Sequence, residues 1–331
     1  MKKIAIVKLS ALGDIVHAMV ALQFIKTRFP QLQIDWLVEA RFADLLRDNP
    51  HISNILTVNL KAAKTNKLAI FNEIKTVQNY AQENYDLVID AQGLLKSAIT
   101  ARFLGKNVAG FDKNSIRESL ASLFYSKKIA CAYDENTIDR NCAVLAKSLD
   151  FSISHDEILN KQPFLFFHSP AVDFQPFLKH DLKNIVFVIG STWASRNYPA
   201  AKFVEVANTL KQNCLVIWGN QAEFETAQKM ALQSDFIQVL PALNLNDLKA
   251  LLSKVDLVIG NDTGPTHIAW GLNVPSITLF GCTPISRVYQ TSINKVLKSP
   301  SLVNPRKLDK TDNSIKQIEV FEIAALAKAL L

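Results

Sequence analysis

The stretch IAIVKLSALGDIVHA, residues 4–18, decides how the chain begins to fold. Its apolar run, Ile4 to Val7, predicts a buried strand, and the small polar turn that follows passes directly into a helical pattern. Open α/β folds bind their ligands at the carboxyl edge of the sheet, which is where Asp14 would stand. Asp14 is therefore a candidate general base. The same position also suits an Asp that only caps the first N–H groups of a helix.

The composition of this turn favours a functional role. Gly13 allows a ligand to approach the backbone closely. Lys8, Ser10 and His17 add three polar groups near the same strand end. We therefore expect Asp14 to be catalytic and Lys8, Ser10 and His17 to contact the substrate on which it acts.

Short apolar runs alternate with longer helical patterns along most of the chain. Helical periodicity is clearest from Ile15 to Ile25 and from Ile116 to Phe124. This alternation predicts parallel sheets that are covered by helices on both faces. The predicted strands are residues 4–9, 34–38, 55–58, 87–90, 108–111, 184–190, 214–218, 236–240, 257–260 and 277–280.

The length of 331 residues predicts two domains, since one hydrophobic core rarely serves more than about 250–300 residues. The strand pattern lapses over residues 152–181, which contain three prolines, so the boundary should fall there. We expect a first domain over residues 1–165 and a second over residues 166–313. Residues 314–331 show an apolar face at Ile315, Ile318, Phe321 and Ala325, which predicts a helix that returns toward the first domain.

Composition excludes several classes of protein. No apolar run reaches the roughly 18 residues of a membrane span, and the amino-terminal residues lack a signal-peptide pattern, so we expect a cytoplasmic protein. The cysteines, Cys131, Cys142, Cys214 and Cys282, show no metal-ligand spacing. They predict buried free thiols and no metal site.

Positive charge is concentrated in the first half of the chain. The net charge is +7, and residues 61–128 hold eleven Lys or Arg against six Asp or Glu. Such a surface attracts anionic headgroups, a phosphorylated substrate or nucleic acid. Nucleic acid is the weakest of these interpretations, because no recognised binding motif accompanies the charge. A solvated basic face is the simpler alternative.

A second turn, GNDTGPTHIA at residues 260–269, also joins a predicted strand to a helical pattern. Its glycines, its Thr hydroxyls and the free N–H groups of a helix start together predict a phosphate-binding site. The candidate ligand contacts are Asp262, Thr263, Gly264 and His267. A tight turn with Asp262 or Thr263 as a cap is the alternative.

Two further strand ends add candidate ligand groups. Ser191 and Thr192 follow one strand, and Arg196 could bind a diphosphate through its fork of donors. Glu223 follows another strand and could accept hydrogen bonds from a sugar. No G-x-G-x-x-G follows a predicted strand and no G-x-x-x-x-G-K-[ST] is present, which argues against a dehydrogenase and a P-loop enzyme.

With these motifs in view, the chain resembles the lipopolysaccharide heptosyltransferases of glycosyltransferase family nine, most closely those of type I. The resemblance runs through nearly the whole chain. Residues 117–125 carry the likeness to type I. The matching segments are residues 6–14, 88–97, 117–125 and 260–267.

The resemblance implies a GT-B architecture, in which two Rossmann-like domains face each other across a central cleft. It implies transfer of L-glycero-D-manno-heptose from ADP-heptose to Kdo-lipid A, with inversion and without a metal or other cofactor. Asp14 would deprotonate the acceptor hydroxyl. Ser191, Thr192, Arg196 and the turn from Asp262 to His267 would hold the diphosphate.

The resemblance also implies acceptor contacts, because Kdo-lipid A is negatively charged and membrane-bound. From the basic segment and its surroundings we expect Lys61, Lys64, Gln92, Lys96, Arg117 and Arg140 to belong to this set. The protein would then bind the inner membrane peripherally, on its cytoplasmic face, and would not bind nucleic acid.

The sequence departs from the type I pattern where Arg196 replaces a Lys, and Glu225 competes with Glu223 for one role. A type II or III enzyme acting on heptose and a non-catalytic nucleotide-sugar-binding protein stay open as alternatives.

Overall fold

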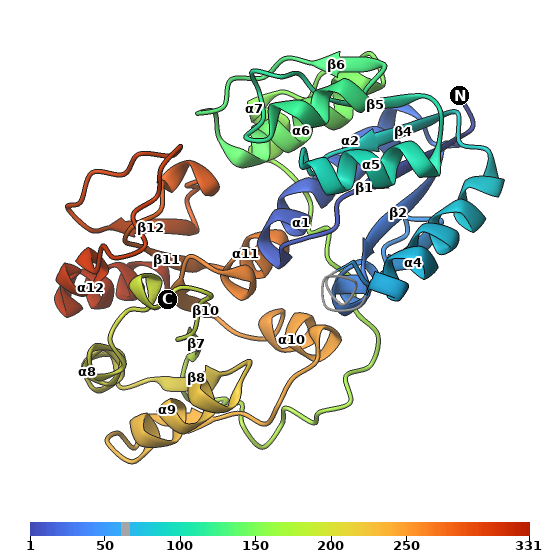
Figure 1. Ribbon diagram of the computed structural model, residues 1–331. Helices are drawn as coiled ribbons and strands as arrows, with labels where there is room; N and C mark the ends of the chain where they lie inside the picture. The colour runs from blue at the N-terminus through green and yellow to red at the C-terminus, as the bar shows by residue number, and fades with distance from the viewer. Residues whose placement is uncertain (61–66) are drawn as a thin grey trace. The chain divides into compact units, whose positions relative to one another are not determined.

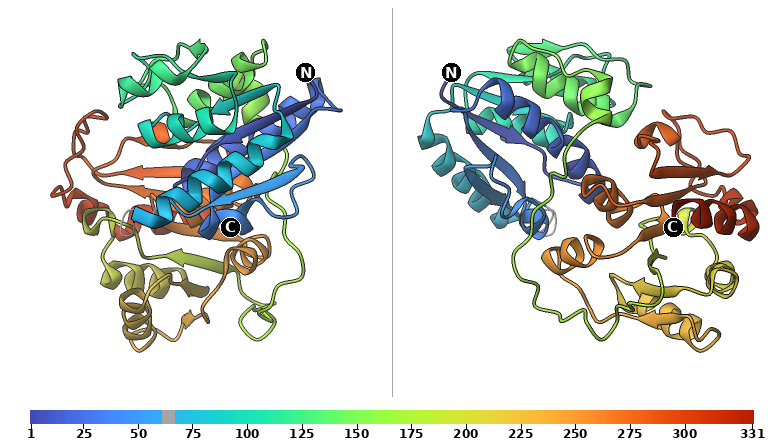
Figure 2. Two further views of the ribbon diagram at one scale, coloured as in Figure 1. Left: turned by 45° about the vertical axis from the view of Figure 1, so that its right-hand side comes forward. Right: turned by 180° about the vertical axis from the view of Figure 1, so that it is seen from behind.

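The computed structural model describes residues 1–60 and 67–331, and the chain divides into two units, Met1–Phe166 and Phe167–Leu331 (Figures 1 and 2). The predicted boundary near residue 165 is close to this division. Lys61 and Lys64 lie outside the described residues. Within the described residues, no helix has the length and apolar character needed to cross a bilayer.

The first unit is a parallel sheet between two layers of helices. Its strands are β1 (Lys3–Val7), β2 (Gln33–Glu39), β3 (Asn54–Val58), β4 (Leu87–Asp90), β5 (Val108–Phe111) and β6 (Lys127–Ile129). Its α-helices are α1 (Leu12–Met19), α2 (Ala21–Arg28), α3 (Ala43–Leu46), α4 (Lys67–Tyr80), α5 (Leu95–Leu104), α6 (Thr137–Ser148) and α7 (His155–Leu159). Short 3-10 helices include η4 (Ser119–Phe124).

The strand order in this sheet is β3-β2-β1-β4-β5-β6, the Rossmann order. The chain leaves β1 toward one edge and later returns to β4 on the other side, so the topology reverses between β1 and β4. Helices α1, α2 and α6 pack together, and so do α4, α5 and η4. Figure 1 shows α4 and α5 in front of the sheet, and the reverse view in Figure 2 brings α6 forward.

The second unit repeats the same plan. Its strands are β7 (Asn184–Val188), β8 (Asn213–Ile217), β9 (Ile237–Val239), β10 (Leu257–Asn261), β11 (Ser276–Phe280) and β12 (Asn294–Lys298). Its α-helices are α8 (Ala200–Leu210), α9 (Gln221–Ala231), α10 (Leu245–Leu252), α11 (Gly264–Gly271) and α12 (Val320–Leu330). The sheet order β12-β11-β10-β7-β8-β9 is again the Rossmann order, with its reversal between β7 and β10.

The predicted strands are all present, with small differences at their ends. Sequence patterning missed β6 and β12. Both pair with one neighbour within the described residues, and their lysines and partly exposed positions hide the apolar run that marks an inner strand. The predicted helix from Ile15 to Ile25 is present but divides at Val20 into α1 and α2.

Two helical predictions are wrong in detail. The periodic residues from Ile116 to Phe124 form only the short η4, and its Leu120 and Leu123 are exposed instead of facing a core. The terminal pattern divides into η7 (Ser314–Gln317) and α12.

The last helix differs from the prediction in its buried face. Ile323, Ala324 and Ala327 enter the core of the second unit, whereas Phe321 and Ala325 are exposed. The chain breaks between η7 and α12, so one helical periodicity does not run through both. Because α12 packs on α8 and β11, it belongs to the second unit. Its expected return toward the first unit stays a prediction.

Candidate functional site

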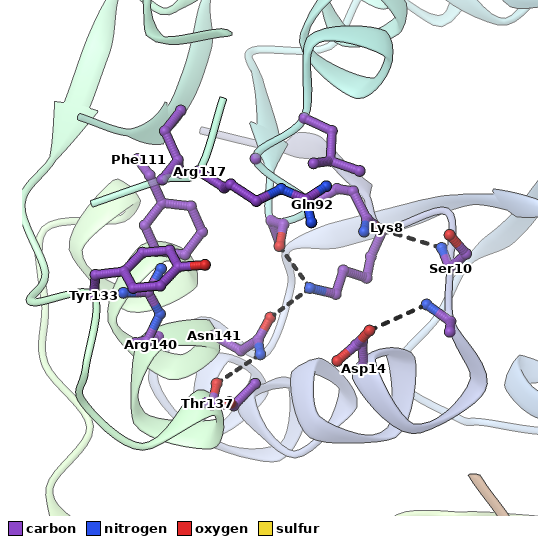
Figure 3. A pocket seen from close by; sticks show the side chains of 15 residues that line it. Lys8, Ser10, Asp14, Gln92, Phe111, Arg117, Tyr133, Thr137, Arg140 and Asn141 are labelled. Carbon is purple, nitrogen blue, oxygen red and sulfur yellow. Dashed lines mark hydrogen bonds between the residues drawn. The ribbon is translucent and has the colours of Figure 1, made fainter. Parts of the chain in front are cut away.

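The first candidate site is a cavity of about 390 Å³ at the carboxyl ends of β1 and β4, where the sheet reverses its order. Figure 3 shows the side chains that line it. Its walls come from the loop after β1, the loop after β4, the residues leading into η4, and α6. The lining residues predicted from sequence are Lys8, Ser10, Asp14, Gln92, Arg117 and Arg140.

Asp14 both bonds the backbone at the start of a helix and lines the cavity. It stands in the first turn of α1, and its carboxylate accepts the N–H of Ala11 at 3.3 Å. The same carboxylate lines the cavity (Figure 3). The N-terminal end of a helix stabilises a negative charge. The Asp14 carboxylate therefore lies at the start of α1 and in contact with the cavity.

Lys8 is a buried cation at the base of the same cavity, with 6% of its surface exposed. Its Nζ donates to the carbonyl oxygen of Ala91 at 2.8 Å and to Oδ1 of Asn141 at 2.9 Å. Such bonds offset the cost of removing an ammonium group from water. Lys8 therefore ties the end of β1 to the end of β4 and to α6.

The loop after β4 is ordered by Asp90. This buried carboxylate accepts the hydroxyls of Tyr125 at 2.7 Å and Ser97 at 2.9 Å, together with backbone N–H groups of Gln92 and Gly93. Burial raises the pKa of Asp90 above its ordinary value, although these bonds oppose the rise. Gly93 has φ +69°, and a Cβ there would approach Ile116 to 2.8 Å, so glycine is required.

Gln92 braces the opposite loop. Its Oε1 accepts the N–H groups of Leu9 and Ser10, each at 3.1 Å, which aligns the two loops beside Asp14. Gln92 was predicted to contact the acceptor; the structure shows that it also holds the two loops together.

Two arginines line the cavity in different ways. Arg140 on α6 donates to the carbonyl oxygens of Ala132 at 2.6 Å and Ser115 at 2.5 Å, and its guanidinium lies against the rings of Phe111 and Tyr133. Arg117 is exposed and lies 3.5 Å from Glu118. Arg140 is therefore rigid, whereas Arg117 has room to meet a ligand.

Two predicted contacts, His17 and Lys96, are not brought to this cavity by the described structure. His17 is fully buried, because one turn of helix carries it from the sheet edge toward the packing between α1 and α6. Lys96 is exposed on α5 and borders a different, apolar groove. Tyr133, Thr137 and Asn141 line the cavity but were missed, since nothing in their local sequence marks them.

The second candidate site lies in the second unit, at the carboxyl ends of β7, β8 and β10. Asp262 is its centre and is 1% exposed. Its carboxylate accepts from Thr283 Oγ1 at 2.8 Å and bonds His267 Nε2 at 3.1 Å. The guanidinium groups of Arg287 and Arg196 lie 3.6 and 3.8 Å from it.

These partners determine the charge of Asp262. Burial alone raises its pKa, but the nearby Arg287, the hydrogen bond from His267 and the charge of Arg196 outweigh burial. The pKa of Asp262 therefore lies well below its ordinary value. Because the carboxylate is buried, it positions the arginines beside the turn instead of facing a ligand itself.

Arg196 is held at two points, since its Nη2 also donates to the backbone carbonyl oxygen of Asp262. Its guanidinium lies over the ring of Trp193, which Lys310 also approaches. One nitrogen of Arg196, Nη2, thus lies near both the carbonyl and the carboxylate oxygens of Asp262.

The helix α11 begins at Gly264, directly after this network. Among the described residues, no side chain caps its first N–H groups, and Thr263 precedes it with extended backbone. Free N–H groups at a helix start favour an anion. Gly260 allows β10 to lie close to β7, because a Cβ there would approach that of Val188 to 2.4 Å.

Glu223 stands at the neighbouring strand end. Its carboxylate accepts the N–H of Gly219 and the Nδ2 of Asn220, each at 2.7 Å. A Cβ on Gly190 would meet this carboxylate at 2.0 Å. Glu225 instead bonds Gln221 on α9 at 3.1 Å. Glu223 is therefore the one of the two that adjoins the loop bearing Ser191 and Thr192.

Sequence reasoning missed Arg287 and Thr283, which reach Asp262 from residues beyond β11. Neither belongs to the turn motif, so no local pattern could have identified them. Within the described residues, no group of three or more His, Cys, Asp or Glu side chains is arranged to hold a metal ion.

Comparison with known proteins gives one consistent result. The model of glycosyltransferase family 9 (heptosyltransferase) matches residues 74–314. A lipopolysaccharide heptosyltransferase 1 from Campylobacter coli is 35% identical over 99% of this chain and 98% of its own length. The corresponding Escherichia coli K12 protein is 31% identical over 85% of this chain and 88% of its own.

Solved structures agree with these relatives. E. coli heptosyltransferase WaaC with ADP-2-deoxy-2-fluoro heptose has a TM-score of 0.79 and 25% identity, covering 98% of this chain and 99% of that chain. E. coli ADP-heptose lps heptosyltransferase II has a TM-score of 0.74 at 16% identity, over 99% and 98% of the two chains, and supports the fold. The two Rossmann-like units are thus those of a GT-B protein, and the chain belongs to glycosyltransferase family 9, the heptosyltransferases.

Proposed function

We propose that this glycosyltransferase transfers L-glycero-D-manno-heptose from ADP-heptose to a Kdo hydroxyl of Kdo-lipid A. The observation that carries the proposal is Asp14, whose carboxylate lines a cavity that also contains arginine side chains. A base and cations in one cavity suit an acceptor that bears both a hydroxyl and negative charges. The relatives named lipopolysaccharide heptosyltransferase 1 support heptose as the transferred sugar and lipopolysaccharide as the class of product.

In the proposed reaction, Asp14 accepts the proton of the attacking hydroxyl as the new bond to the anomeric carbon forms. The bond from that carbon to the diphosphate breaks on the opposite side, which inverts the configuration. Negative charge grows on the departing ADP. Arg196, Arg287 and the start of α11 are the groups we assign to stabilise that charge without a metal ion.

Release of ADP tests the transfer directly. Purified protein is incubated with ADP-heptose, with and without Kdo-lipid A, alongside Asp14→Ala. We expect acceptor-dependent release that falls by about 10²–10⁴-fold in the variant, the range typical of a general base. Binding of ADP-heptose should persist.

Asp44→Ala is the matched control, because Asp44 is also an aspartate in the first turn of a helix but pairs with Arg47 at 3.1 Å. It should retain full activity. Undiminished release in Asp14→Ala would remove the assigned base.

Two alternatives have their own outcomes. Release that requires heptosylated core in place of Kdo-lipid A would indicate a type II or III enzyme. Donor binding with no release on either acceptor would indicate a non-catalytic nucleotide-sugar-binding protein. The anomeric configuration of the product tests inversion, and unchanged activity after chelation with EDTA tests independence from a metal.

We further propose that the protein works at the cytoplasmic face of the inner membrane and binds its anionic surface peripherally. Lys61 and Lys64 are assigned to the acceptor or to that surface, on the basis of the charge surplus in residues 61–128. The double variant Lys61→Glu, Lys64→Glu should raise the acceptor KM and weaken binding to anionic vesicles at low salt. If both are unchanged, the assignment is wrong.

A further inference from the structure

One helix layer of the first unit exposes large apolar side chains. Helix α4 packs beside α5, and α5 packs beside η4, so these three elements form one surface, which we call the α4/α5/η4 face (Figures 1 and 2). Its exposed apolar side chains are Ile70, Phe71, Leu95, Ile99, Phe103, Leu120 and Leu123. Phe71 and Leu123 are 70% and 73% exposed. Apolar side chains gathered on one surface mark an interaction site.

An apolar groove opens on this face between α4 and α5. It encloses about 290 Å³ and is lined by Leu60, Ile70, Ile74, Val77, Ile99 and Phe103, with Glu73, Lys96 and Thr100. Most of these side chains are hydrocarbon along their whole length, so the groove offers few partners to a polar ligand. It suits an extended hydrocarbon chain.

The charges on the three elements are mainly positive. Their described charged side chains are those of Lys75, Lys96 and Arg102, against Glu73. The carboxylate of Glu73 accepts the N–H of Asn59 at 2.8 Å. Exposed apolar groups together with basic residues are typical of surfaces that lie in the headgroup region of an anionic membrane.

The second unit provides an internal comparison. It has the same strand order, but its exposed large apolar residues are dispersed: Phe167, Leu182, Leu232, Ile285, Leu302 and Phe321. These residues lie on different loops and helices. The gathering of apolar side chains is thus specific to one layer of one unit and does not follow from the fold.

Two elements of the α4/α5/η4 face follow residues that line the cavity containing Asp14. Helix α5 begins directly after Leu94, and η4 begins shortly after Arg117; both of these residues line the cavity. An acceptor with its sugar in the cavity and its acyl chains in a bilayer needs a membrane-contacting surface beside the cavity.

We propose that the α4/α5/η4 face docks on an anionic lipid leaflet. Phe71, Leu120 and Leu123 enter the interfacial region, the basic residues meet headgroups, and the groove between α4 and α5 receives an acyl chain. This inference rests on the proposed function only in its choice of a bilayer as the partner. The proposed function named only an attraction between basic residues and the membrane. The inference adds which surface of the protein contacts the membrane and that this surface is apolar.

The test measures binding of the full chain to vesicles without donor or acceptor. Vesicles of phosphatidylethanolamine and phosphatidylglycerol are compared with vesicles of phosphatidylcholine. The variant Phe71→Ser, Leu123→Ser should bind the anionic vesicles about tenfold more weakly, since two apolar side chains no longer enter the interface. Its thermal unfolding should be close to that of the parent, because both side chains are exposed in the free protein.

Leu232→Ser, Phe321→Ser is the matched control, because these side chains of the second unit are 87% and 71% exposed. It should bind vesicles as the parent does. Equal binding by both double variants, or no binding by the parent, would overturn the proposal. A parent dimer that separates only in Phe71→Ser, Leu123→Ser would assign the face to a second copy of the chain.

Activity separates this inference from the proposed function. With a deacylated, water-soluble acceptor, Phe71→Ser, Leu123→Ser should transfer heptose at the parental rate, whereas its KM for acceptor in vesicles should rise. Vesicle binding without heptose transfer would refute the function and retain the docking face. Transfer with unaltered KM in vesicles would refute the docking face and retain the function.

Discussion

The two units share one strand order, yet their candidate sites place their charged side chains differently. In the first, Lys8 is buried at the base of the cavity, Asp90 is buried in the loop after β4, and the carboxylate of Asp14 lines the cavity. In the second, the buried charge is the carboxylate of Asp262, and Arg196 and Arg287 surround it. The reversal of strand order therefore locates a site in each unit, whereas the side chains at the strand ends decide which charge lies beside a ligand.

This difference suits two separate chemical roles, one for each site. A carboxylate held at a cavity can accept a proton. Arginines held by a buried carboxylate, beside the start of a helix, can neutralise a leaving diphosphate. The comparison predicts that the two hydrogen-bond networks act independently. A variant in the Asp262 network should weaken binding of the donor only, and a variant in the Lys8 network should leave donor binding unchanged.

The largest effect is expected for Asp262→Ala. Removing this carboxylate leaves Arg196 and Arg287 close together without their shared anion. Loss of one partner from a buried ion pair costs about 3–5 kcal/mol, which denaturant unfolding would measure. ADP affinity should fall as well. Stability and ADP affinity equal to those of the parent would show that the network does not hold the arginines.

The pH dependence of stability examines the same carboxylate. The pKa of Asp262 is below its ordinary value, so its stabilising contribution is present above the unfolded pKa of about 4 and is lost as the pH falls toward the folded pKa. Below about pH 4, the parent should therefore lose unfolding free energy more steeply than Asp262→Asn. If the unfolding free energies of the two proteins fall equally with pH, the lowered pKa of Asp262 is contradicted.

Arg287→Ala addresses a residue that sequence reasoning did not identify. A charged hydrogen bond is worth about 1.5–3 kcal/mol, so ADP should bind about 10–100-fold more weakly in isothermal titration. Arg306→Ala, at another and exposed arginine of the second unit, is the control and should bind ADP normally. Equal affinities in both variants would exclude Arg287 from the donor site.

Lys8→Met tests the buried cation at the base of the cavity. The change leaves the carbonyl oxygen of Ala91 and Oδ1 of Asn141 without this donor, which should cost about 1–3 kcal/mol of unfolding free energy. A double-mutant cycle with Asn141→Leu should show coupling between the two positions. ADP affinity should not change, and a loss of it would break the separation of the two networks.

The smallest effect is expected for Glu223→Gln. The carboxylate accepts the N–H of Gly219 at a strand end, and the charge at a helix start contributes about 0.3–1 kcal/mol. ADP-heptose affinity should fall slightly, and affinity for ADP alone should change less. Glu225→Gln serves as the control. A larger loss in that control would reassign the sugar contact.

Local sequence was sufficient for much of the fold. Inner strands such as β1 and β10 are buried along their whole length, so their apolar runs were visible without any tertiary information. The edge strands β6 and β12 were not predicted, because an edge strand is partly exposed and contains polar residues that interrupt the apolar run. The helix predicted at residues 116–124 was wrong in detail: its leucines are exposed, and periodicity cannot distinguish a buried apolar face from an exposed one.

Sequence alone determined the two α/β units, the strand ends that bear Asp14 and Asp262, and the family. These features depend on neighbours in the chain: an apolar run, a turn and a helix start. Only the tertiary structure decided that His17 is buried, that Lys96 borders an apolar groove, and that Arg287 reaches Asp262. The physical reason is that burial and ion pairing join residues distant in sequence, and no local pattern records which of them will meet.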